Sequence, residues 1–153
     1  MEEIADLMAH FEIGDAKPWT HAAHLTMAFW YLSRMDEAQA TDRIRSGILH
    51  YNECQGTPNT DTRGYHETLT IFWIRVVSKF LNEADASWTD LETVNRLLEK
   101  YAGQSGLWRE YYSFDLIPSG ESRRKWIEPD RQGLNTGGPS GTAEPSPRGS
   151  DAA

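Results

Sequence analysis

The strongest constraint in this 153-residue chain is a run of large apolar residues at helical spacing near its centre. Apolar side chains recur every three or four residues over the range 65–81, which places them on one face of a helix. They are Leu69, Phe72, Trp73, Val76, Val77 and Phe80. The β-branched members also fit a strand, but the length and spacing of the run favour a helix. A stripe this wide must be buried against other elements, so the chain requires a core.

Other segments show the same helical period, and no segment alternates with the period of a strand. Thr20 and either Thr89 or Asp90 suit helix N-caps, and Gly14 and Gly103 suit helix ends. Two short helices are predicted on either side of Pro118, and longer ones over 4–13, 21–35, 36–55 and 90–102. We therefore predict an all-α fold, a compact antiparallel helical bundle of four main helices plus short helices.

The composition of the chain changes near Asp130. The residues that follow are mainly glycine, proline, serine and threonine, and Leu134 is the only large apolar residue among them. Such a segment cannot bury enough apolar surface to offset the entropy lost on ordering. We predict a helical domain over residues 1–130 and a disordered C-terminal tail over residues 131–153.

Charge and cysteine content narrow the classes of partner. The formal net charge is −8, so the chain repels phosphate backbones and nucleic-acid binding is disfavoured. The single cysteine, Cys54, allows no disulfide within the chain and suits a reducing compartment. The chain has no apolar run near the roughly 18 residues of a membrane span, and its acidic N-terminus does not resemble a signal peptide. We predict a cytoplasmic protein that acts on a small molecule without membrane or nucleic acid, with a homodimer possible.

Histidines stand out as candidate ligands. His21 and His24 are three residues apart at the start of one predicted helix, so they share a face of that helix. His66 stands at the start of the central helix, on its apolar side. If the intervening helix runs antiparallel to both, the two helix starts lie at the same end of the bundle. The prediction is that His21, His24 and His66 bind one divalent metal ion (Zn, Fe, Mn or Ni) with a coordination position left open. A polar cluster without metal and three unrelated histidines are the alternatives.

Acidic groups next to these histidines would supply proton transfer. Glu67 or Asp61 would carry protons, and Tyr65 is a further candidate catalytic group. Metal-bound water would be the nucleophile or the base. The predicted function is a small metal-dependent enzyme, a hydrolase or lyase acting on a small polar metabolite. The alternative is a non-catalytic helical module for small-ligand binding or interaction, in which the histidines and Glu67 form a structural polar cluster.

The loop before the central helix is rich in polar side chains. Asn59, Thr60 and Arg63 are predicted to bind the substrate, because an amide, a hydroxyl and a guanidinium can orient a polar molecule. The alternative function of this loop is local: Asn59, Asp61 or Thr62 would cap the helix that follows.

Four sequence motifs occur together in one order. They read WTHAAHLTMAFWYL at 19–32, GILHYNECQGTPNTDTRGYHETLT at 47–70, YYS at 111–113 and WIEPD at 126–130. This set resembles a widespread bacterial family of small helical proteins of unknown function over the range 11–130. The resemblance implies a helical fold and transfers no catalytic residue. The paired histidines are also similar to those of the metal-binding DinB-like helical bundles, although the ligand spacing of those bundles is not reproduced.

Overall fold

The described part of the chain is built from helices. The computed structural model describes residues 1–15 and 19–134, and within these ranges it contains no β-strand. The helices are α1 (Glu2–Ile13), α2 (His21–Leu32), α3 (Glu37–Cys54), α4 (Glu67–Glu83), α5 (Asp90–Tyr101), the 3₁₀ helix η1 (Leu107–Glu110) and α6 (Gly120–Arg124). The all-α prediction is confirmed. None of the helices in the described ranges is both long and apolar enough to cross a membrane.

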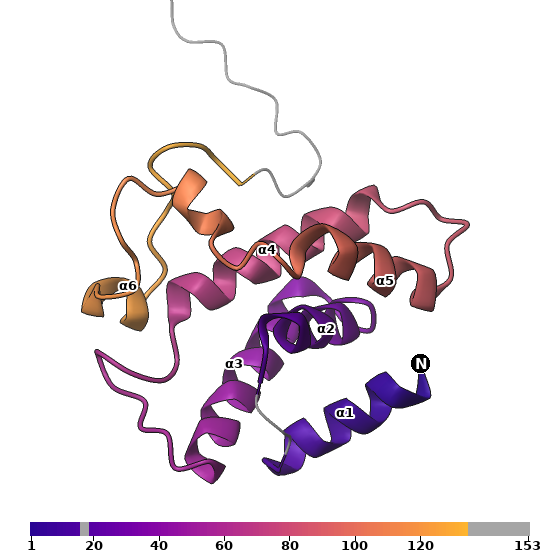
Figure 1. Cartoon of the computed structure of the whole chain (residues 1–153), viewed down its shortest axis with the longest axis horizontal. Helices are drawn as coiled ribbons and strands as arrows, with labels where there is room; N and C mark the ends of the chain where they lie inside the picture. Colours follow the sequence, from indigo (N-terminus) through magenta and orange to yellow (C-terminus); the bar gives the residue numbers. More distant parts are fainter. Residues whose placement is uncertain (16–18, 135–153) are drawn as a thin grey trace, which may run out of the picture.

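Helix α2 lies at the centre of the fold and packs against α1, α3, α4 and α5 (Figure 1). Half of its residues are buried, and they point in several directions around the helix axis. They are Leu25, Thr26, Met27, Ala28, Phe29 and Tyr31. A helix that is apolar around most of its circumference belongs in a core. The predicted antiparallel bundle of four main helices is not confirmed, because four other helices gather around α2.

Helix α4 joins two apolar clusters. On one side Ile74 and Val77 belong to the main core around α2. On the other side Phe72 and Val76 pack with the aromatic C-terminal segment, which includes Trp108. The apolar stripe predicted for this helix is wide because its residues pack into both clusters.

Local capping sets most of the helix starts. The Thr20 hydroxyl accepts a hydrogen bond from the amide of Ala23 at 3.1 Å, and the Asp36 carboxylate accepts one from the amide of Gln39 at 2.8 Å. Thr89 forms a capping box with Glu92. Helix α1 ends at Gly14, which has a φ of 80° in the left-handed region that glycine adopts without strain. Thr20, Thr89 and Gly14 agree with the caps and the helix end predicted from the sequence, and Asp36 lies at the predicted start of the helix over 36–55.

The C-terminal segment continues to contact the domain beyond Asp130. The amide of Arg131 donates to the carbonyl of Tyr111 at 2.9 Å, and the side-chain amide of Gln132 donates to the carbonyl of Glu110 at 3.2 Å. Leu134 packs against the cluster around Phe72. Ordered contacts thus extend past the predicted domain boundary at 130. The remainder of the predicted tail, 135–153, lies outside the described residues.

Truncation of Phe72 tests the junction between the two clusters. Phe72 is 0% exposed, so Phe72→Ala is expected to lower the free energy of unfolding by about 3–5 kcal/mol, the usual loss for a buried aromatic ring. The control is Phe114→Ala, because Phe114 is 42% exposed and its removal should cost less than about 1 kcal/mol. Urea unfolding followed by circular dichroism measures both. Similar losses for the two variants would contradict this description of the core.

Candidate functional site

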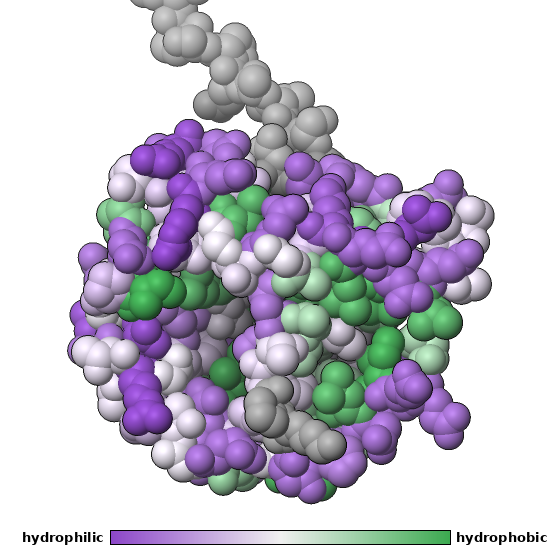
Figure 2. Space-filling view, viewed as in Figure 1, coloured by the Kyte–Doolittle hydropathy of each residue, from purple (hydrophilic) through white to green (hydrophobic). Residues whose placement is uncertain are grey.

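A cavity of about 410 Å³ lies between α2, α3 and α4, next to the start of α2. The space-filling view shows a hollow on this face of the molecule, with hydrophobic side chains at its edges (Figure 2). Its wall is largely aromatic and aliphatic. The lining residues are Phe11, Trp19, His21, His24, Met27, Ala28, Ile44, Ile48, Tyr51, Asn52, Gly64, Tyr65, His66, Leu69, Thr70, Trp73, Ile74 and Ser105. The three histidines predicted to share a site therefore line one cavity.

His21 is held at the cavity wall by a backbone contact from another helix. Its Nε2 donates to the carbonyl of Tyr101, at the end of α5, over 3.2 Å. A carbonyl only accepts, so Nε2 carries the proton and Nδ1 of the neutral ring keeps a lone pair. The ring also meets Trp73 edge-on, with the ring centroids 4.4 Å apart. Burial lowers the pKa of His21, although the Tyr101 carbonyl acts in the opposite direction.

His24 lies one turn further along α2. Burial lowers its pKa to about 4, with a smaller lowering from neighbouring His21 and an opposing effect of the Thr20 carbonyl. Its ring meets the ring of Trp19 edge-on, with centroids 5.9 Å apart. His24 is consequently neutral at pH 7 and presents an uncharged imidazole to the cavity.

His66 holds two parts of the backbone together through its ring nitrogens. It is the N-cap of α4: its Nδ1 accepts the amide of Leu69 at 3.1 Å, and its Nε2 donates to the carbonyl of Leu116 at 2.9 Å. Both ring nitrogens are therefore engaged, and a metal ion could bind His66 only after one of these bonds broke. Among the described residues, no group of three or more His, Cys, Asp or Glu side chains is arranged to hold a metal ion. The three-histidine metal site stays a prediction.

Glu67 lies behind the cavity wall in an ion pair. Arg45 donates to its two carboxylate oxygens at 2.6 and 3.1 Å, and the Tyr65 hydroxyl donates to it as well. Burial raises the pKa of Glu67, but the bonds from Arg45 and Tyr65 outweigh burial, so the net shift is downward. Burial and the Glu67 carboxylate raise the pKa of Tyr65. This arrangement stabilises an ionised, fully bonded carboxylate, which is a weak proton acceptor.

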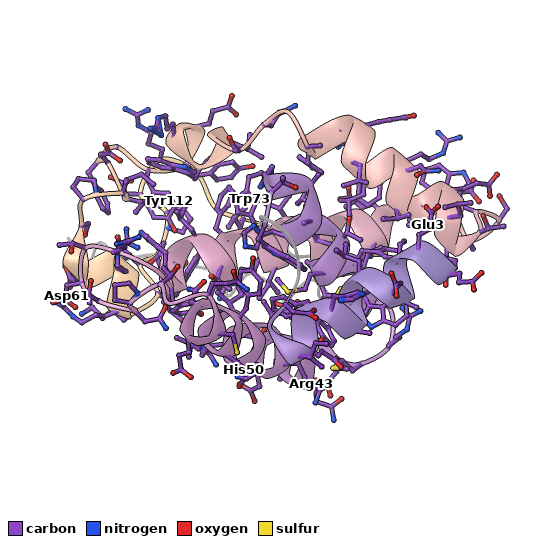
Figure 3. The ribbon with its side chains drawn as sticks, turned by 60° about the horizontal axis from the view of Figure 1, so that its bottom comes forward. Glu3, Arg43, His50, Asp61, Trp73 and Tyr112 are labelled. Atoms are coloured by element: carbon purple, nitrogen blue, oxygen red, sulfur yellow. The ribbon has the colours of Figure 1, made fainter. Side chains whose placement is uncertain are left out.

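Residues 59–63 of the loop before α4 are joined by hydrogen bonds within the loop and are not part of the cavity wall, whereas Gly64 and Tyr65 at the end of the loop line it. The Asn59 side-chain oxygen accepts the amide of Tyr65 at 3.1 Å, and the amide of Thr60 donates to the carbonyl of Arg63 at 2.9 Å. Asp61 pairs with Arg124 of α6 at 2.6 Å. Asp61 is at the outer edge of the molecule, whereas Trp73 lies inside it (Figure 3).

The predicted substrate groups Asn59, Thr60 and Arg63 are therefore not among the lining residues. The alternative that Asn59, Asp61 or Thr62 caps α4 is wrong, because His66 is the cap. The error has a physical reason: the imidazole Nδ1 accepts an amide as a carboxylate does, but histidine is not among the residues typical of caps.

The sequence does not predict which aromatic residues line the cavity. Trp19, Tyr51 and Trp73 line the cavity together with Phe11. The sequence pattern places such residues on apolar faces but does not distinguish a ring that fills the core from one that faces a cavity. The packing of three helices makes that distinction.

The lowered pKa of His24 predicts that the stability of the protein depends on pH. Unfolded chains bind a proton at this histidine below about pH 6.5, but the native protein binds it only below about 4. The unfolded state thus binds more protons at His24 between these values, so the contribution of His24 to stability is expected to fall by at most about 3 kcal/mol as the pH drops from 6.5 to 4. Urea unfolding across this range measures the loss.

The matched variant is His24→Gln, which does not titrate and should lose less stability over the same interval. Part of the slope should remain, because the pKa values of His21 and His66 are also lowered by burial. Equal slopes for the wild type and the variant would mean that His24 is not neutral in the native protein.

Comparison with known proteins adds no relative. No family model matches the sequence, and no curated protein or solved structure is significantly similar to it. The resemblances to the bacterial helical family and to DinB-like bundles stay predictions. The chemistry of the cavity is what indicates a function for this chain.

Proposed function

We propose that this protein binds a small, mostly apolar molecule in the cavity between α2, α3 and α4. The cavity carries the proposal: its volume of about 410 Å³ and its aromatic wall are typical of small-molecule sites. Such sites hold a few polar groups that orient the ligand. Here those groups include His21, His24, Asn52 and Thr70.

The bonding of the other polar candidates supports binding over catalysis. The ionised Glu67 is paired with Arg45. His66 uses both ring nitrogens, one to cap α4 and one to donate to the Leu116 carbonyl. A general base needs a free lone pair within reach of its substrate. These two residues are better suited to hold the cavity wall in place, which is the role of a structural polar cluster.

Titration with indole tests the proposal. Indole is uncharged, aromatic and small enough for the cavity, so the amide resonances that shift should belong to its wall. The variant Ile48→Trp replaces a lining side chain of α3 with a large indole ring that would occupy part of the cavity. It should weaken binding about tenfold or more, since a loss of ~1.4 kcal/mol in binding free energy is a factor of ten in the dissociation constant. The measurement is ¹H–¹⁵N NMR, with circular dichroism to verify that the variant folds.

The control is Ile13→Trp. Ile13 is 65% exposed on α1 and is not among the lining residues, so this variant should leave binding unchanged. Shifts scattered over the surface, or no shift up to the solubility limit of indole, would contradict the proposal.

A second candidate function is a metal-dependent hydrolase or lyase at the same cavity. The observation that favours it is the pair His21 and His24, which line the cavity from one turn of α2 and have lowered pKa values. Metal ions bind neutral imidazole, so such a pair is suited to two of the ligands of a divalent ion. Bound metal would supply an activated water, and Tyr65 at the wall would face the substrate.

Elemental analysis tests the metal candidate. Protein purified without chelator or histidine tag, then supplied with Zn, Fe, Mn or Ni, should retain close to one ion per chain if His21 and His24 bind it. His21→Ala and His24→Ala should each remove most of the metal, and exposed His10→Ala should not. Wild type that retains no metal after loading would exclude this function and leave the binding proposal standing.

A further inference from the structure

The cavity wall carries no formal charge among the described residues. Its lining includes no aspartate, glutamate, lysine or arginine. Glu67, which accepts a hydrogen bond from the wall residue Tyr65, is paired with Arg45 at 2.6 Å. A charged ligand would lose its hydration without gaining a counter-ion, which costs several kcal/mol in an apolar site. The described part of the wall therefore favours an uncharged ligand.

The polar groups that the wall does offer include imidazole lone pairs. The Tyr101 carbonyl engages the protonated Nε2 of His21, so the Nδ1 of that ring is an acceptor. His24 lines the same cavity. A neutral imidazole has one N–H and one nitrogen with a lone pair, so the ring of His24 also offers an acceptor.

His24 is the better placed of the two acceptors. The His21 ring is tethered to α5 and packed against Trp73. His24 lies one turn further along α2, beside Trp19, whose ring contacts those of Phe11 and Tyr51. A ligand ring placed against these aromatic side chains would bring a polar edge to the His24 imidazole.

We infer that the occupant of the cavity is an uncharged aromatic molecule with an N–H or O–H donor, and that His24 accepts this donor. The inference rests on the proposed binding function and specifies its ligand class. An apolar ring would occupy the cavity, whose wall includes Trp19, Tyr51 and Trp73, and one donor would set its orientation. A heteroaromatic N–H compound or a phenol fits this description.

Indole and benzofuran make the test pair. They have the same bicyclic shape and differ at one ring atom, an N–H donor in indole and an oxygen in benzofuran. The wild-type protein should bind indole about three- to tenfold more tightly than benzofuran, which is the net effect of one hydrogen bond. Dissociation constants come from isothermal titration calorimetry on the full chain.

Three variants locate the acceptor. His24→Phe keeps a ring and removes the lone pair, so the two compounds should bind it equally. His24→Gln keeps an acceptor oxygen and should restore a preference for indole, which a merely structural effect of the substitution would not do. His50→Phe is the matched control, because His50 is exposed and outside the wall, and it should retain the full preference.

Each other outcome is decisive. Equal binding of indole and benzofuran by the wild type would overturn the inference and leave the binding function intact. Loss of the preference in His21→Phe instead of His24→Phe would overturn the assignment to His24. Tighter binding of benzoate or benzylammonium than of either neutral compound would overturn the uncharged class. If no compound binds, both the inference and the proposed function fail.

Discussion

The burial of α2 is the constraint on which the rest of the structure depends. Leu25, Met27 and Phe29 are each 1% exposed although they point to different sides of the helix, so neighbours are required all around it. Helices α1, α3, α4 and α5 supply those neighbours. Since the hydrophobic effect is roughly proportional to the apolar area removed from water, burying this one helix stabilises the whole arrangement.

The cavity follows from where that burial is incomplete. At its first turn α2 carries two histidines instead of large aliphatic residues. Trp19 contacts Phe11 of α1 and Trp73 of α4 contacts His21, but these aromatic rings leave a cavity. The same burial lowers the pKa of His24 and keeps the site neutral. The C-terminal segment fixes the part of the wall before α4: Arg124 pairs with Asp61 of the preceding loop, and the Leu116 carbonyl accepts a hydrogen bond from the wall residue His66.

Much of the fold could be predicted from local signals. The caps Thr20, Asp36 and Thr89 and the terminator Gly14 act within a few residues, so their effect can be read without knowing the tertiary structure. The clustering of His21, His24 and His66 around one cavity followed from their common position at helix starts. The capping by His66 could not be predicted in this way, because histidine is not among the residues typical of caps and its ring is also bonded to Leu116, fifty residues away.

The sequence by itself determined the helical class, most helix ends and the net charge of −8, because periodicity and capping are properties of short segments and charge follows from composition. Only the tertiary structure decided which rings face a cavity, which carboxylate is paired, and which histidine nitrogens are engaged by distant carbonyls. Those properties depend on contacts between distant segments. The ion pair between Arg45 and Glu67 and the hydrogen bond from His21 to the Tyr101 carbonyl form only when the helices pack around α2.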